Sequence, residues 1–170
     1  MTPAAHISAA IEILDELARR RRPAADVLKD WGASHRFAGS KDRAAIASLV
    51  FDALRKAASS VFVMGAETSR AQMLGALREA RGLDVEAIAA LCSGEGHAPA
   101  PLSDEERTRL ESATLDGAPD HVRGDYPEWL AERFTEAFGD SAAQEGAALS
   151  ARAPVDLRVN ILKGSRDEAL

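Results

Sequence analysis

Hydrophobic positions along most of this 170-residue chain repeat at the three- and four-residue spacing of helices. Such faces run through about residues 3–20, 24–31, 41–64, 70–81, 85–93, 104–112, 128–138 and 142–152. Capping residues, glycine or proline bound each of them. The stretch 41–64 is the longest, and we expect it to be one central helix that ends at Gly65. The pattern predicts an all-α protein over about the first 150 residues.

The last seventeen residues follow a different pattern. Apolar and polar residues alternate strictly from Val155 to Ile161, which is the period of a half-buried β-strand. Ser165 and Glu168 then form a capping box, which predicts the start of another helix. A lone strand cannot satisfy its own backbone hydrogen-bonding groups. We therefore expect residues 154–170 to begin a truncated α/β domain, with the strand pairing with another copy, folding against the helices or lacking order.

Composition and motifs exclude several classes of protein. The net charge is -6, and hydrophobic residues make up 46% of the chain, as is usual for a globular domain. The single cysteine, Cys92, excludes an internal disulfide and a cysteine-based zinc cluster, and no histidine pair has the spacing of helical metal ligands. No apolar stretch has the length of a membrane span, and no secretory signal is evident. We expect a cytoplasmic protein with no metal and no membrane partner.

Basic residues concentrate at the front of the chain. The first sixty residues carry ten Lys/Arg and seven Asp/Glu, although the whole chain is acidic. The densest cluster is Arg19, Arg20, Arg21 and Arg22, at the expected end of the first helix. Guanidinium groups pair bidentately with phosphates, so this run is a candidate nucleic-acid contact. The alternative, equally open, is a solvated helix end whose cations complement the helix dipole.

A second candidate contact surrounds the turn before the longest predicted helix. Arg36 and Lys41 flank this turn, where helix N–H groups also suit a phosphate. They either extend the basic face of the arginine run or lie in solvent. For Arg43 we favour a local capping or ion-pair contact.

Two stretches carry a resemblance to known families. Residues 40–55, SKDRAAIASLVFDALR, follow a first helix ILDELARRRRPAADVL and resemble the NusB-like helical domain. PEWLAERFTEAFGD and ARAPVDLRVNILKGSRDEAL, at 127–140 and 151–170, resemble the segment ahead of the catalytic domain in Sun/Fmu (RsmB-like) rRNA cytosine methyltransferases. The two resemblances occur in the order found in that family.

The resemblance implies a fold and a function. It implies a NusB-like helical domain over residues 1–95, a helical connector over 96–153 and the start of the truncated α/β region over 154–170. The chain would be the RNA-binding accessory region of an S-adenosylmethionine-dependent 16S rRNA (cytosine-C5)-methyltransferase. Its partners would be rRNA and the missing catalytic domain. NusB proteins usually carry their arginine-rich RNA site nearer the start of the first helix, so the run found here is displaced.

The resemblance also bears on single residues. Arg158 and Lys163 lie in a segment that leads, in the family, into a small subdomain that helps grip RNA, although such polar residues also serve to stabilise a strand. The family's catalytic cysteine motifs and glycine-rich cofactor turn do not occur, and Cys92 matches neither cysteine. We therefore expect no catalytic and no cofactor-binding residue, and no activity of these 170 residues alone.

Two other functions stay open. One is a free-standing antitermination factor of the NusB type, which binds RNA together with a ribosomal protein. The other is a protein-interaction bundle that docks on a catalytic domain. The connector and the predicted strand favour the methyltransferase interpretation, because a free-standing factor needs neither.

Overall fold

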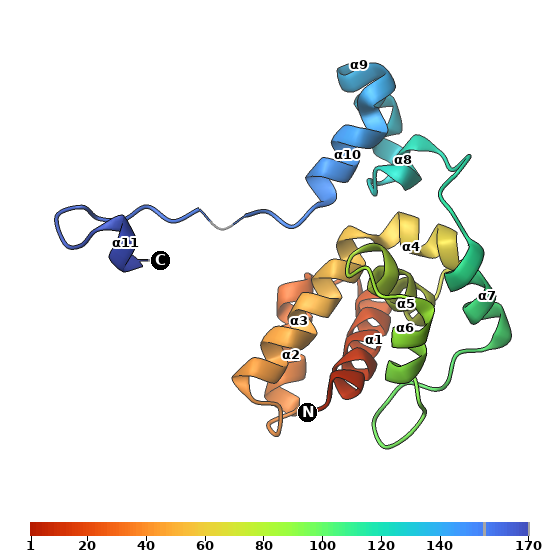
Figure 1. Cartoon of the computed structure of the whole chain (residues 1–170), viewed down its shortest axis with the longest axis horizontal. Coiled ribbons are helices and arrows are strands. Elements are labelled where there is room, and N and C mark those ends of the chain that lie inside the picture. Colours follow the sequence, from red (N-terminus) through yellow and green to blue (C-terminus); the bar gives the residue numbers. More distant parts are fainter. Residues whose placement is uncertain (155, 170) are drawn as a thin grey trace.

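A computed structural model describes residues 1–154 and 156–169, and their regular structure is helical (Figure 1). Its elements are α1 (Pro3–Arg20), α2 (Ala24–Ser34), α3 (Ser40–Arg55), α4 (Ala57–Met64), α5 (Ser69–Glu79), α6 (Val85–Leu91), α7 (Asp104–Ser112), α8 (Asp120–Arg123), α9 (Ala131–Phe138), α10 (Ala142–Ser150) and α11 (Arg166–Ala169), with short 3-10 turns at Glu128–Leu130 and Gly139–Ser141. The predicted all-α character is confirmed for these residues. None of the described helices is long and apolar enough to cross a bilayer.

The main hydrophobic core lies among α1 to α7. Ile13 of α1, Ile46 of α3 and Leu74 of α5 are almost completely buried in it. The core also takes in Leu110 of α7, so helix packing continues past residue 95, where the sequence places the end of the bundle. Burial of these aliphatic side chains supplies the main stabilising free energy of the bundle.

The tightest helix contact is between α4 and α5, and a glycine makes it possible. A Cβ atom placed on Gly75 of α5 would lie 2.6 Å from the Cα atom of Ser60 in α4. Ser60 is itself fully buried. Because no side chain separates them, the two backbones approach closely.

The expected single helix over residues 41–64 is wrong: the chain forms α3 and α4, which are separated at Lys56. Lys56 has φ −107° and ψ 30°, which ends α3, while its N–H still donates to the carbonyl of Asp52 at 3.0 Å. The hydrophobic spacing continues across the break, so periodicity alone could not reveal it.

A smaller helical unit, α8 to α10, sits beside α4 (Figure 1). Its centre is Tyr126, which is buried and stacks on Phe134 of α9 with ring centroids 4.0 Å apart. Gly124 and Gly146 leave room for the ring, since a Cβ atom at either position would lie within 2.5 Å of a Tyr126 ring carbon. Trp129 lies in the 3-10 turn before α9 and is 79% exposed, so its ring does not contribute to this small core.

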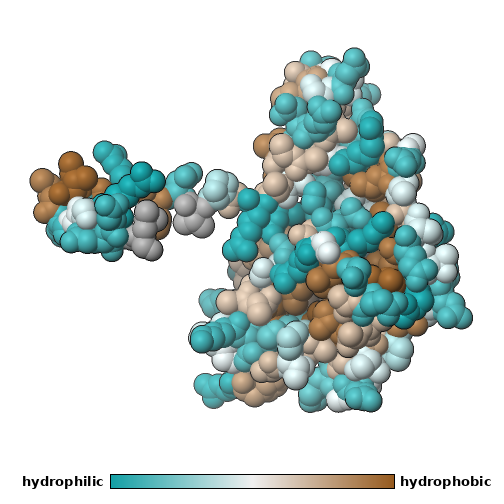
Figure 2. Space-filling view, viewed as in Figure 1, coloured by the Kyte–Doolittle hydropathy of each residue, from teal (hydrophilic) through white to brown (hydrophobic). Residues whose placement is uncertain are grey.

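The C-terminal segment extends away from the helical body (Figure 1). The predicted β-strand is not formed by residues 156–161, and Val155 lies outside the described residues. The described part of the chain offers no partner strand for these residues, and the start of an α/β domain is not seen. Figure 2 shows hydrophobic side chains gathered at the tip of this segment, where Ile161 and Leu162 are exposed. The predicted capping box of Ser165 and Glu168 is confirmed and opens α11.

Candidate RNA-binding surface

The arginine run lies at the C-terminal end of α1, where the sequence places it. Arg19 and Arg20 occupy the last turn, and Arg21 ends the helix in the left-handed conformation with φ 48°. The Arg21 N–H closes the helix by donating to the carbonyl of Leu17 at 3.0 Å. The reversal directs the chain into α2, so Arg22 follows on the far side of the turn.

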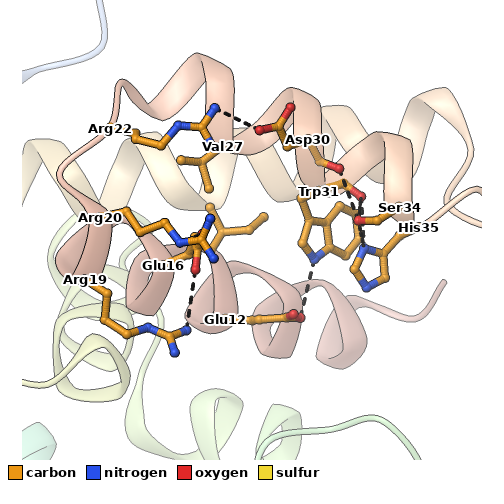
Figure 3. Close-up of a pocket in the computed structure, with 11 residues that line it drawn as sticks. Glu12, Glu16, Arg19, Arg20, Arg22, Val27, Asp30, Trp31, Ser34 and His35 are labelled. Atoms are coloured by element: carbon orange, nitrogen blue, oxygen red, sulfur yellow. Dashed lines mark hydrogen bonds and ion pairs between the residues drawn. The ribbon is translucent and has the colours of Figure 1, made fainter.

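Three of these arginines line a cavity between α1 and α2, and Figure 3 shows them at one end of it. The cavity has a volume of about 350 Å³. The side chains of Trp31, Ser34 and His35 lie toward its other end (Figure 3). The lining is completed by Glu12, Ile13, Glu16, Val27 and Asp30.

Acidic side chains of the same two helices pair with the arginines. Arg20 Nε lies 2.8 Å from a carboxylate oxygen of Glu16, and Arg19 approaches the same carboxylate at 3.7 Å. Arg22 pairs with Asp30 of α2 at 2.8 Å. The cavity is therefore close to electrically balanced rather than strongly positive.

These ion pairs are weak, which keeps the arginines available. The side chains of Arg19 and Arg20 are 70% and 65% exposed. Exposed pairs contribute about 0–1 kcal/mol each, and salt screens them. Arg21 is exposed, and the described residues contain no ion pair to it. Phosphate groups can therefore compete for the run, with Arg21 as its readiest contact.

Arg36 and Lys41 lie apart from the arginine run. Both are exposed, Arg36 just after α2 and Lys41 in the first turn of α3. Arg36 follows His35, which lies at the opposite end of the cavity from the arginines (Figure 3). A single compact basic face is not formed, and a ligand touching both groups would have to span the length of α2. The local contact expected for Arg43 is confirmed, since its Nε donates to the carbonyl of Ala38 at 2.9 Å.

Arg158 and Lys163 are not brought to the arginine run. Both are exposed on the C-terminal segment, which Figure 1 shows far from α1 and α2. Lys163 belongs to a turn that its N–H closes by donating to the carbonyl of Asn160 at 2.9 Å. These two residues can contact RNA only as a separate site.

Sequence reasoning missed an aromatic cluster next to the arginine cavity. The rings of Trp31 and His35 stack with centroids 4.2 Å apart, and Phe37 meets His35 edge-on at 5.7 Å. Trp31 Nε1 also donates to a Glu12 carboxylate oxygen at 3.4 Å. The four-residue spacing of Trp31 and His35 on one helix was the available signal.

A polar joint between the bundle and the α8–α10 unit was also missed. The Asp125 side chain is only 2% exposed. It accepts a hydrogen bond from the Lys56 ammonium at 3.2 Å. It also accepts hydrogen bonds from the backbone N–H and the hydroxyl of Ser59, each at 2.9 Å. Lys56 donates further to the Ser150 hydroxyl at 2.8 Å. Asp125 has φ 53°, a conformation that the joint must hold in place.

Cys92 and the metal-ligating residue types take structural positions in the described part of the chain. Cys92 is buried in the core, and burial raises the pKa of its thiol, which disfavours the nucleophilic thiolate. No group of three metal-ligating side chains occurs in the described ranges. S-adenosylmethionine does not fit the residues present, because 1–154 and 156–169 hold no strand-to-helix turn to cradle it.

Comparison with known proteins identifies the C-terminal part of the chain. Residues 126–170 match the family described as Methyltr_RsmF/B-like, ferredoxin-like domain. This segment is therefore similar to the ferredoxin-like domain of RsmF/B-like methyltransferases. The resemblance to RsmB-like methyltransferases is thereby confirmed, while the NusB-like character of the preceding bundle stays a prediction. No match was found among curated proteins or among solved structures. The RsmF/B-like segment begins at Tyr126, directly after the joint residue Asp125.

Proposed function

We propose that this chain is the RNA-binding accessory region of an RsmF/B-like 16S rRNA (cytosine-C5)-methyltransferase. It places substrate RNA for a catalytic domain that supplies S-adenosylmethionine chemistry and is not contained in these 170 residues. The arginine run at the end of α1 provides the main phosphate contact. The setting is the cytoplasm, where rRNA is made and modified.

The family match carries this proposal. Residues 126–170 match a domain type named for RsmF/B-like methyltransferases, and a helical bundle precedes it. The exposed Arg19 to Arg22 run supports RNA as the ligand, since basic side chains supply most of the affinity for a phosphate backbone. A free-standing antitermination factor is less well supported, because it would not need an RsmF/B-like segment.

The test is RNA binding as a function of salt concentration. Fluorescence anisotropy with a labelled single-stranded rRNA fragment gives the affinity of the intact chain at several salt concentrations. We expect log K to fall linearly with log salt, by about 0.7 per phosphate contact for single strands. Arg21→Gln is expected to weaken binding and to reduce that slope by about one contact.

A matched control separates the run from surface charge in general. Arg133 of α9 is also exposed, and it forms an ion pair with Glu136 away from the arginine run. Arg133→Gln removes the same charge and should leave affinity and slope unchanged. Equal losses in the two variants would reject the arginine run as the site, and absence of binding at low salt would reject the RNA-binding function.

A specific observation supports one further role, that of a docking bundle. Asp125 ties α4 of the bundle to the residues just before the RsmF/B-like segment. The bundle would then fix the orientation of that segment, whether or not it also touches RNA. Tight binding to a separately made catalytic domain, without binding to RNA, would favour this function over the first.

A further inference from the structure

A second cavity, of about 740 Å³, shares Glu12, Trp31 and His35 with the arginine cavity. The turn between α2 and α3 and the loop after α6 contribute to its wall. The side chains that matter for its chemistry are Glu12, Trp31, His35, Phe37, Glu95 and His97. None of the arginines of the run lines it.

Aromatic rings form one wall of this cavity. Phe37 is 72% exposed, although large aromatic side chains are normally covered. Its ring meets that of His35 edge-on, and His35 in turn stacks on Trp31. Such a set of rings offers its faces to a flat or cationic group that arrives from solvent.

The charges of the cavity favour a cation. Glu12 and Glu95 are exposed carboxylates, and the described residues contain no salt bridge to either. The only cation in the lining is the amino group of Met1, which pairs with Asp42 at 3.0 Å. Arg36 is close in sequence but is not part of the lining. Phosphates would meet uncompensated carboxylates here, whereas a guanidinium could pair with a carboxylate and lie on the aromatic rings.

We propose that this cavity binds an arginine side chain presented by a basic segment of a partner protein. The guanidinium stacks on Phe37 and pairs with Glu95 or Glu12. The inference goes beyond the proposed function, because it assigns a protein ligand to a surface that does not include the arginine run. The two proposals are tested separately at Phe37 and Glu95, because these residues line only the second cavity, whereas Glu12 and Trp31 line both.

Trp31 provides the readout. In a Trp129→Phe background Trp31 is the sole tryptophan, and it lies in the cavity wall. The probe is the peptide acetyl-Gly-Arg-Gly-Arg-Gly-amide, and its control carries citrulline in place of arginine, which keeps the shape and removes the charge. We expect a saturable change in Trp31 emission with the arginine peptide and a much weaker one with citrulline.

Variants then locate the site. Glu95→Gln and Phe37→Ala should each lower the affinity for the arginine peptide by about fivefold. The circular dichroism spectrum should stay unchanged, because both side chains are exposed. Equal affinity for the citrulline peptide, or unchanged affinity in both variants, would overturn the proposal. So would a Phe37-dependent response to a single-stranded hexanucleotide without a response to the arginine peptide, which would assign the rings to base stacking.

Discussion

The Asp125 carboxylate accepts a hydrogen bond from the backbone N–H of Ser59 at 2.9 Å, although the two residues are sixty-six positions apart in the sequence. This contact joins the segment just after α8 in one helical unit to the first turn of α4 in the other. Because Lys56 binds both Asp125 and Ser150, three separate segments meet at the Lys56–Asp125 pair. The joint therefore fixes how the RsmF/B-like segment leaves the bundle.

Removal of the Asp125 carboxylate should lower the free energy of unfolding. Asp125→Ala leaves the Lys56 ammonium and the Ser59 N–H without their partner in a partly buried site. Breaking a buried charge pair costs about 3–5 kcal/mol, and we expect the lower end because Lys56 is partly exposed. Asp125→Asn tolerates the left-handed backbone and isolates the side-chain effect. Urea unfolding measures the loss, and Asp140→Ala, an exposed aspartate, should stay within about 0.5 kcal/mol of the parent.

The contact of α4 with α5 predicts opposite effects for two glycine substitutions. Gly75→Ala should lower the free energy of unfolding by about 1–3 kcal/mol, because its Cβ would meet the Ser60 backbone at 2.6 Å. Gly32→Ala in α2 meets only the flexible Arg43 side chain, at 3.4 Å, and should be neutral or gain about 0.5–1 kcal/mol from helix propensity. Thermal unfolding of both variants checks the pair, and equal effects would contradict the close helix approach.

A salt bridge between α5 and α7 gives a prediction about geometry. Arg70 binds Glu106 through two nitrogens, at 2.7 and 3.0 Å, and also donates to the carbonyl of Ala100. Arg70→Lys keeps the positive charge but cannot bind Glu106 through two nitrogens. We therefore expect the free energy of unfolding to fall by about 1–2 kcal/mol. Arg107→Lys is the control, because Arg107 pairs with the largely exposed Glu86. If both lysine variants lose the same free energy of unfolding in urea, the two-nitrogen contact of Arg70 with Glu106 gives no extra stability.

Acid should weaken the contact of α1 with the start of α3. The pKa of Asp42 falls from 3.8 to about 2, first through the hydrogen bond from His6, then through the N-terminal ammonium and the Gly39 N–H. Since the folded pKa lies below the unfolded one, this contribution is complete above about pH 4 and disappears as the pH falls through 2. Asp42→Asn should therefore reduce the pH dependence of stability in that window, as measured by urea unfolding at several pH values. An unchanged pH profile would show that Asp42 titrates normally.

Acidic neighbours should restrain RNA binding by the arginine run. Glu16 pairs with both Arg19 and Arg20, so Glu16→Gln frees two guanidinium groups and removes one negative charge. We expect RNA affinity to rise about threefold to tenfold at low salt, with the gain shrinking as salt increases. Glu136→Gln makes the same charge change beside Arg133 on α9 and should have little effect. A fall in affinity on Glu16→Gln would mean that Glu16 orients the arginines for RNA.

Local signals in the sequence were enough for most helices. Capping residues mark several of the helix starts: Thr2 caps α1, Asp84 caps α6, and Ser103 with Glu106 forms a capping box at α7. Ser141 with Gln144 has the same pattern but forms no box, because Ser141 ends a 3-10 turn and donates to the carbonyl of Phe138. The two patterns differ in the backbone of the serine, which is extended at Ser103 and not at Ser141.

Contacts between distant segments could not be predicted from spacing. The break at Lys56 lies within an unbroken helical pattern, and its side chain is satisfied by Asp125 and Ser150, sixty-nine and ninety-four positions away. The pairing of Arg22 with Asp30 likewise depends on the turn at Arg21. The arginine run was visible in the sequence, but its partial neutralisation was not.

The helix break at Lys56 has a mechanical consequence. A continuous rod from α3 through α4 would impose one axis on both helices, whereas the interruption lets α4 take the direction that its close packing on α5 requires while α3 stays packed against α1. The lysine at the break also binds the downstream unit. The residue that redirects the helix is therefore the same one that sets the orientation of the downstream unit against the bundle.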